Sequence, residues 1–387
     1  MGEKKIVNKL VLVGNGFDLA LGLKTNYEDF LLWYFKGSLI NALENNQYKS
    51  TSEGDRVLHL FEDEFFIIYS KIRVVSLHNV LWQVKENFSS YEDVKNFITR
   101  NPKHIVFKFK SELLEKIFKY SISGWVDIEK AYFDLLKDSF KKNDLKIDQL
   151  NKDLIRIKSL LHQYLNQLDI SNSDLEDVAK KYNSQFISKI DQTDLIDGFN
   201  ELDEVKTEKL FFINFNYTKT VANVLNFIGE QYGFSLKDNF PQINICHIHG
   251  DLEDVDSMIF GYGDEMDTDY KSIEDSNDNQ YFQGIKSFKY AENGKYRDLL
   301  RFLNSDDYQV VIYGHSCGLS DRVMLNEIFE HDNCKSIKIH FYDKQEFINK
   351  TMDISRHFKS NQLMRKKIVE YDEKNRIPQA KEILKQE

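Results

Sequence analysis

The sequence predicts an α/β protein with a Rossmann-like parallel sheet and a large all-helical insertion after the first strand–helix unit. Three observations predict this fold. Residues 10–16 are an apolar run that ends in Gly-Asn-Gly and passes directly into a helical pattern, which is typical of a buried parallel strand turning into a helix. From residue 206 onward, short strands rich in β-branched and aromatic residues alternate with helical segments. Between these parts, apolar residues recur at helical spacing and strand signals are almost absent.

The same patterns predict the organisation of the chain. We expect a Rossmann-like core at residues 1–26 and 206–360, a helical insertion at 27–205 and a C-terminal helix or tail at 361–387. The acidic, polar segment 263–280 is expected to be a solvated loop or an active-site lid. After the first strand at 10–13, strands are expected at 209–215, 243–249, 258–262, 309–313 and 336–342, and helices at 218–231, 297–304, 320–330 and 344–357.

Composition bounds the class of protein. The chain has 387 residues, a net charge of −10 and 41% hydrophobic residues, so it can form a sizeable core and lacks the basic balance of a general nucleic-acid-binding protein. Its three cysteines form no C-x-x-C pair, which favours a reducing compartment. The sequence has neither the apolar core of a signal peptide nor a run as long as a membrane span. We therefore expect a cytoplasmic protein without membrane contact, and the sequence leaves a homo-oligomer open.

The first turn makes a nucleotide the first ligand to consider. Gly14 and Gly16 occupy the first two positions of G-x-G-x-x-G, and the third position is Leu19. In such a turn the N-terminus of the helix is open to phosphate. Asp18 would repel phosphate, so it is expected to cap the helix, face a sugar or face an attacking water. The candidate binding residues here are Gly14, Asn15, Gly16 and Phe17.

Two asparagines follow the strand predicted at 209–215. Asn214 and Asn216 are two residues apart, so both amides can point to one ligand. An uncharged amide suits ribose hydroxyls or a water molecule. The alternative is that Thr218 caps the next helix while the asparagines satisfy backbone groups of the loop. Asn216, Asn214 and Thr218 are retained as candidate site residues.

Two histidines end the strand predicted at 243–249. His247 and His249 share a face, and imidazole titrates near neutral pH, so His249 is the candidate general base. Metal binding with Asp251 is a second interpretation, but no third ligand can be named, and we expect no metal. The third interpretation is that both histidines are packed at the end of the strand. Gly250 would let a ligand or another backbone segment come close.

The segment 314–318 has the pattern G-x-S-x-G, which is typical of the nucleophile in α/β-hydrolases. Asp343 and His357 would complete the order Ser, Asp, His with Ser316. Against this, the next helix is expected to begin only at Ser320, and no oxyanion segment is recognisable. The other interpretation is a hydrogen-bonding loop near a nucleotide, with Ser320 and Asp321 capping the helix. The candidate binding residues of this loop are Gly314, His315, Ser316 and Asp321.

These segments carry a family resemblance. The chain resembles the bacteriophage abortive infection AbiH family in VLVGNGFDLALGLKT, WVDIE, NFNYT, HIHG and YGHSCGLSD, in that order and almost from end to end. The motifs also follow the order found in sirtuin-like (SIR2-like) NAD-binding domains. That resemblance implies that Gly14 and Gly16 bind NAD, that Asn216 lies on the ribose side and that His249-Gly250 supplies the catalytic histidine. It also implies that Gly314-x-Ser316 lies near the adenosine half.

The chain departs from the sirtuin-like pattern at three points. Thr218 stands where the pattern has Asp, and Asp18 stands where it has Ser. The paired C-x-x-C motifs of the deacetylase zinc module are missing, which argues against protein deacylation. Several antiphage SIR2-like proteins hydrolyse NAD, so the resemblance implies depletion of NAD as the output of defence.

The sequence thus predicts an NAD⁺ glycohydrolase with NAD as its substrate. His249 would be the general base, Asn216 would position ribose or water, and Asp18 would stabilise the developing positive charge. A phage or host protein is expected to trigger it. Two alternatives remain open: a non-catalytic nucleotide-sensing component, and a serine hydrolase that uses Ser316.

Overall fold

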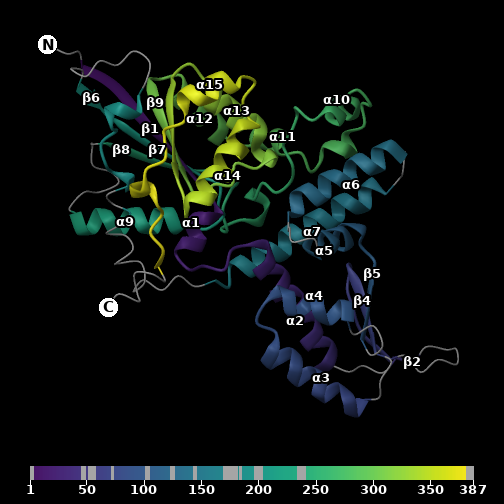
Figure 1. Ribbon diagram of the computed structural model, residues 1–387. Helices are drawn as coiled ribbons and strands as arrows, with labels where there is room; N and C mark the ends of the chain where they lie inside the picture. Colours follow the sequence, from purple (N-terminus) through teal and green to yellow (C-terminus); the bar gives the residue numbers. More distant parts are fainter. Residues whose placement is uncertain are drawn as a thin grey trace. The chain divides into compact units, whose positions relative to one another are not determined.

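The computed structural model describes residues 4–44, 49–50, 58–70, 74–100, 105–122, 127–142, 146–168, 182, 185–195, 204–232 and 241–380 (Figure 1). The chain divides into two compact units. We call them the core unit and the insertion unit. The core unit comprises Met1–Lys24, Leu165–Ser276 and Ile285–Glu387, and the insertion unit comprises Thr25–Tyr164 and Asn277–Gly284.

The core unit contains a parallel sheet. Five strands have the order β10-β9-β1-β7-β8, and β6 also pairs with β1, all in parallel. If these five strands are numbered 1 to 5 along the chain and the sheet is read from β8 to β10, the order is 3-2-1-4-5, as in doubly wound proteins. The predicted Rossmann-like sheet is therefore confirmed. The strands are β1 (Lys4–Val13), β6 (Glu204–Lys206), β7 (Lys209–Asn214), β8 (Gln242–His247), β9 (Asp307–Tyr313) and β10 (Cys334–His340).

Helices cover both faces of this sheet because neighbouring residues of a strand point to opposite sides (Figure 1). Leu10 and Leu12 of β1 pack in the hydrophobic cluster that includes Leu299, Leu325 and Ile354. The intervening Val11 and Val13 pack in a second cluster with α9. The helices are α1 (Asn15–Ala20), α9 (Thr220–Tyr232), α12 (Lys295–Leu303), α13 (Arg322–Glu330), α14 (Lys344–Ser355) and α15 (Asn361–Lys367).

The chain between β8 and β9 differs from its prediction in two places. Residues 258–262 are not a strand, and only Tyr262 forms an isolated bridge, with Ile285. The acidic segment 263–280 contains the helix α10 (Thr268–Glu274), whose first turn is capped by the side chain of Asp267. The short helices η2 (Val255–Ser257) and α11 (Lys286–Tyr290) flank this segment, and η3 (Asn279–Phe282) follows α10 within the insertion unit.

The described part of the C-terminal segment packs against the sheet. After α15, Val369 N donates to Ile337 O of β10, and Ile377 N donates to Phe341 O. Ile377 is buried in the same cluster as Val11. Residues 368–377 therefore run beside β10 rather than as a frayed tail, with the single turn η5 (Glu373–Asn375) among them.

The prediction of an all-helical insertion is wrong, because the insertion unit also contains an antiparallel sheet of order β2-β3-β4-β5. Phe66 and Ile68 of β4 are buried while Ile67 between them is half-buried, which is the two-residue period of a strand. The strands are too short to display this period over more than two repeats, so helical spacing matched them as well. They are β2 (Lys49–Ser50), β3 (Leu58–Glu62), β4 (Phe66–Ser70) and β5 (Ile105–Phe109).

Helices make up much of the rest of the insertion unit. The helices are α2 (Tyr27–Glu44), α3 (Val74–Asn87), α4 (Tyr91–Arg100), α5 (Glu112–Ile122), α6 (Ile128–Lys142) and α7 (Ile147–Leu165). Phe35 of α2 packs between a strand and a helix: its ring centroid lies 5.4 Å from that of Phe66 on β4 and 6.0 Å from that of Phe118 on α5. None of the described helices of either unit has the length and apolar character needed to cross a membrane.

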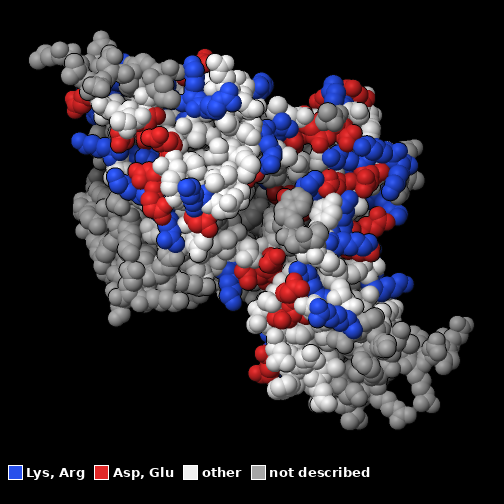
Figure 2. All heavy atoms as spheres, in the orientation of Figure 1, with Lys and Arg blue, Asp and Glu red and all other residues white. Residues whose placement is uncertain are grey.

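Charges of both signs lie on the surface (Figure 2), and the three cysteines are buried. On the face drawn in Figure 2, acidic and basic side chains of the described residues are interspersed. Cys246, Cys317 and Cys334 are free thiols, and each is buried. Burial raises the pKa of the Cys246 thiol to about 11, and that of Cys317 and Cys334 to about 12. At neutral pH all three are therefore protonated.

Candidate functional site

The carboxyl ends of β7, β8 and β9 bring aromatic and imidazole side chains together. Phe215, which follows β7, has its ring centroid 3.9 Å from that of His315 and 5.2 Å from that of His249. His315 follows β9, and His249 lies two residues after β8. Parallel strands end at one edge of a sheet, and in doubly wound proteins ligands bind at that edge. The two histidines lie at this edge.

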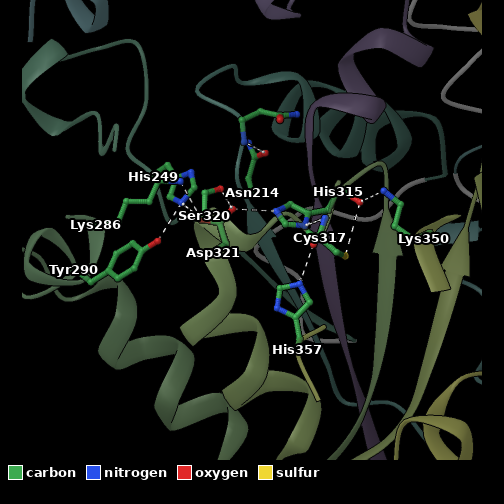
Figure 3. Close-up of polar contacts among 11 residues, drawn as sticks. Asn214, His249, Lys286, Tyr290, His315, Cys317, Ser320, Asp321, Lys350 and His357 are labelled. Carbon is green, nitrogen blue, oxygen red and sulfur yellow. Dashed lines mark hydrogen bonds and ion pairs between the residues drawn. The ribbon is translucent and has the colours of Figure 1, made fainter. Parts of the chain in front are cut away.

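Asp321 joins these loops through its carboxylate (Figure 3). Its Oδ1 lies 3.2 Å from Nε2 of His249 and 3.0 Å from Nζ of Lys286. Its Oδ2 lies 3.7 Å from Nε2 of His315. All four residues are at most 8% exposed. The expectation that Asp321 caps the next helix is wrong, because its side chain makes no capping hydrogen bond and is turned toward these cationic or imidazole groups.

The charges of this cluster determine which group can accept a proton. Burial opposes ionisation of Asp321, but Lys286 and His249 hold the pKa of its carboxyl well below the usual value. Burial, and then the charge of Lys286, lower the pKa of His249 despite the attraction of Asp321. An ionised carboxylate can only accept hydrogen bonds, so Nε2 of His249 carries its proton toward Asp321. The lone pair of Nδ1 is then the basic site of a neutral imidazole.

A cavity of about 650 Å³ lies beside this cluster, within the core unit. Tyr290 and Asp321 both line it, and both side chains contact Nε2 of His249. The ring of Tyr290 is stacked on that of Tyr296, with 5.4 Å between centroids and 9° between planes. Glu265, Asn293, Arg297 and Ser320 contribute polar groups to the wall. A planar ligand with charged substituents fits such a lining.

The glycine turn after β1 packs against the loop after β9. A Cβ on Gly14 would lie 2.5 Å from Cα of His315, and a Cβ on Gly16 would lie 2.8 Å from the carbonyl oxygen of Gly314. Gly16 N donates to Gly314 O at 2.8 Å, and Phe17 N donates to Gly14 O at 2.9 Å. The N–H groups of Gly16 and Phe17, expected to bind phosphate, are thus engaged by backbone carbonyls.

Phe17 and Asp18 are buried side chains. The ring of Phe17 packs against Tyr182, Phe186 and Tyr313 in the core. Asp18 is 1% exposed, and its carboxylate accepts hydrogen bonds from the hydroxyl groups of Thr218 at 2.7 Å and Thr220 at 2.5 Å. These contacts connect the start of α1 to the start of α9. The hydroxyl of Thr218 is thus engaged by Asp18 and does not need a ligand as its hydrogen-bond partner.

The stability of the protein is expected to depend on Asp18 and on pH. Burial raises the pKa of Asp18 to about 6, against the hydrogen bonds from Thr220 and Thr218. Between pH 6 and about 4 the folded state then binds more protons than the unfolded chain, so this group adds stability as the pH falls. Relative to Asp18→Asn, the wild type should gain roughly 2 kcal/mol between pH 7 and pH 4.5. Urea unfolding at both pH values measures this difference.

A matched control is the exposed Asp256→Asn, which is expected to leave the pH dependence as in the wild type. If the free energies of unfolding of Asp18→Asn and the wild type change in parallel with pH, the carboxyl of Asp18 does not titrate in this range.

The two asparagines hold the loop after β7. Asn214 Nδ2 donates to Thr218 O at 3.1 Å and lies 3.3 Å from Nδ1 of His247, and Asn214 Oδ1 accepts from Asn216 N. Asn216 Nδ2 donates to Gly14 O at 3.1 Å, so it connects this loop to the glycine turn. Both amides therefore satisfy backbone groups, which is the alternative that the sequence left open. Asn15 lies at the start of α1.

His247 and His249, at the end of β8, do not face one site. Strand β8 ends at His247, and a turn follows, so the alternation of faces does not continue to His249. His247 lines a second cavity, of about 750 Å³, together with Asp251 and Lys295. Among the described residues, no group of three or more His, Cys, Asp or Glu side chains is placed to hold a metal ion.

The proposed serine triad is not assembled. Ser316 is exposed, and the following Cys317 has the positive φ of 55°. Nε2 of His357 donates to the carbonyl oxygen of Cys317 at 2.8 Å, so it is not available to accept a proton from a serine. Asp343 caps α14 by accepting from Glu346 N at 2.8 Å.

The loop after β9 instead holds itself and His315 in place. His315 Nδ1 accepts from Cys317 N at 3.0 Å, which leaves Nε2 to carry the proton toward Asp321. Lys350 Nζ donates to His315 O at 2.7 Å. Gly314 adopts a φ of +73°, which glycine tolerates and which lets its backbone approach Phe17 N.

Sequence reasoning missed Lys286 and Tyr290. Both lie on the five-residue helix α11, which follows the polar segment 263–280 and is not adjacent to a strand of the sheet. Neither residue follows a strand, so a search for polar residues at strand ends does not find them. No motif marks either residue, and only the fold brings them to Asp321 and His249.

The fold and this cluster define a doubly wound α/β protein with a buried carboxylate–histidine site at the carboxyl edge of its sheet. Residues 10–343 match the family model described as bacteriophage abortive infection AbiH. The chain belongs to the AbiH family, and the match supports a role in antiphage abortive infection. No curated protein and no solved structure gives a significant match.

Proposed function

We propose that this AbiH chain is an NAD⁺ glycohydrolase that depletes the dinucleotide when a phage infects the cell. The observation that carries the proposal is the neutral imidazole of His249, held 3.2 Å from the carboxylate of Asp321 next to a cavity of about 650 Å³. A base of this kind can accept a proton from water near neutral pH. The order of the motifs, which resembles that of sirtuin-like domains, supports NAD as the substrate.

The proposed reaction is hydrolysis at C1′ of the nicotinamide ribose. The bond from C1′ to the ring nitrogen breaks, and its electron pair neutralises the positive charge of the departing nicotinamide. Water forms the new bond to C1′ and gives its proton to the neutral imidazole of His249. Asp321 stabilises the imidazolium that results and supplies negative charge near the oxocarbenium-like transition state. Asp321 takes the electrostatic role that the sequence suggested for Asp18, since Asp18 is engaged by Thr218 and Thr220.

The cavity has features that suit the rest of a dinucleotide. The parallel rings of Tyr290 and Tyr296 offer a face on which a nicotinamide or adenine ring can stack. The guanidinium of Arg297 is exposed and has no ion pair with the residues that the structure describes. Because the glycine turn is occupied by Gly314, we assign the phosphates of the substrate to Arg297 instead.

Replacing Arg297 with glutamine is expected to raise the KM for NAD roughly tenfold with little change in kcat, because one charge-assisted contact to phosphate is lost. Nicotinamide riboside, which has no phosphate, should be cleaved equally by the variant and the wild type. Arg301→Gln is the matched control: this residue lies four positions further along α12 and pairs with Asp298 at 2.7 Å. An equal rise in KM for nicotinamide riboside and for NAD would contradict the assignment of the phosphates to Arg297.

The proposed function is tested by measuring nicotinamide release from NAD with the purified protein, alone and with lysate of phage-infected cells. The lysate is included because we propose that a phage or host protein triggers the activity. Release in either condition supports glycohydrolysis. No release with a lysate that activates a control defence enzyme would overturn it, and NAD binding without release would favour the nucleotide-sensing alternative.

A further inference from the structure

One charged group of the cluster has no part in the reaction described above. Lys286 is 2% exposed, and its Nζ lies 3.0 Å from the same Oδ1 of Asp321 that faces Nε2 of His249. We propose that Lys286 is a positioning residue that keeps Asp321 ionised and His249 neutral, so that His249 can act as a base. The catalytic consequence rests on the proposed function, whereas the effect on His249 does not.

The charges around one carboxylate oxygen favour the neutral form of His249. With Lys286 charged and Asp321 ionised, a neutral His249 leaves a balanced pair in a buried site. Protonating His249 would place two cations against a single carboxylate, away from water, which is costly. Without Lys286, protonated His249 would itself form the balanced pair with Asp321. Lys286 therefore opposes the imidazolium both by direct repulsion and by occupying the carboxylate.

The other titratable groups that face the pair do not replace Lys286. His315 approaches the opposite oxygen, Oδ2, at 3.7 Å, and its pKa is lowered, chiefly by burial. The hydroxyl of Tyr290 lies 3.1 Å from Nε2 of His249, and a tyrosine supplies no positive charge. Among the described residues with a direct contact to Asp321, the lysine ammonium group is thus supplied by Lys286.

The backbone holds Lys286 in this position. Lys286 N donates to Tyr262 O at 3.0 Å, and the preceding Ile285 forms a bridge with Tyr262. A Cβ on Gly263 would lie 3.5 Å from Cβ of Lys286, so the two segments are in close contact. The start of the Lys286 side chain is therefore held against the neighbouring segment 262–263.

The chain offers a matched control on the same short helix. Lys289 lies three residues further on and pairs at the surface with Glu292, at 2.7 Å. The variants are Lys286→Gln and Lys286→Met, which remove the charge, Lys286→Arg, which keeps it, and Lys289→Gln. Glutamine retains a hydrogen-bond donor toward Asp321, so this variant is available if the methionine variant does not fold.

The decisive measurement is the titration of His249 followed by NMR on histidine-labelled protein, with the signal assigned by its loss in His249→Ala. Removing the charge of Lys286 should raise the pKa of His249 by roughly one unit or more. Lys286→Arg and Lys289→Gln should leave it near the wild-type value. A pKa of His249 that is the same in Lys286→Gln and the wild type would overturn the inference, whether or not the protein is an enzyme.

The pH profile of nicotinamide release gives the second readout. In Lys286→Gln the acidic limb of the profile should move upward with the pKa of His249, and Lys286→Arg should restore its position. If the NMR shift occurs while no variant and no wild-type sample releases nicotinamide, the proposed function fails and the role of Lys286 stands. A shifted titration together with an unchanged pH profile would separate Lys286 from catalysis and overturn that part of the inference.

Discussion

His249→Ala is expected to lower the rate of nicotinamide release from NAD by roughly 10²- to 10⁴-fold, the usual contribution of a positioned general base. The variant removes the imidazole that accepts the proton of the attacking water and leaves the carboxylate of Asp321 paired with Lys286. NAD binding should change little, because the stacked tyrosines and Arg297 remain. Release is measured as nicotinamide formed per protein molecule, and binding by calorimetry on the same sample.

The control for this variant is His59→Ala. His59 lies on β3 of the insertion unit, where it pairs with Glu62 at 3.1 Å, and it is expected to leave the rate at the wild-type level. If His249→Ala retains a rate within about twofold of the wild type, His249 is not the base. Unfolding curves of both variants show whether a lost rate reflects a lost fold.

Gly314→Ala is expected to lower the free energy of unfolding by about 3 kcal/mol or more. Two effects add. Its φ of +73° is a left-handed conformation that costs an alanine about 1 to 2 kcal/mol. In addition, the new Cβ would lie 2.3 Å from Phe17 N and 2.7 Å from the carbonyl carbon of Gly16, so the two loops must separate. Urea unfolding of the purified variant measures the loss.

Gly22→Ala distinguishes these two effects. Gly22 has a similar φ of +88°, but a Cβ added to it would have no atom within 4 Å beyond its own chain neighbours. It should therefore show only the conformational cost of about 1 to 2 kcal/mol. Equal losses in the two variants would mean that the contact between the glycine turn and the loop after β9 contributes nothing to stability.

Much of the core fold could be predicted from the sequence because its signals are local. The apolar strand followed by glycines located β1, and the alternation of strands and helices predicted a parallel sheet. The five confirmed strands lie within two residues of their predicted bounds at each end, β1 excepted, which begins six residues earlier. The segment 258–262 has the composition of a strand, but within the part of the chain that the structure describes it forms only the bridge of Tyr262 with Ile285.

The site was predictable only in outline. Polar residues after strands singled out His249, His315 and Asp321, and the fold brings these three together. Whether a glycine opens a phosphate site or allows a close backbone contact depends on the opposite loop, here Gly314, which lies some 300 residues away in sequence. The contribution of Lys286 depends in the same way on tertiary structure, so no local pattern could reveal it.

The three buried thiols allow local opening of the protein to be measured by the rate at which each cysteine is labelled. A thiol reagent needs both access to the sulfur and a thiolate. Burial of Cys246, Cys317 and Cys334 denies access, and their raised pKa values keep the thiolate scarce. Labelling must therefore wait for each thiol to reach solvent. Cys317 lies on the loop that carries His315, whereas Cys246 and Cys334 lie on β8 and β10. The labelling rate of Cys317 relative to the other two consequently measures how often the site loop opens while the sheet stays closed.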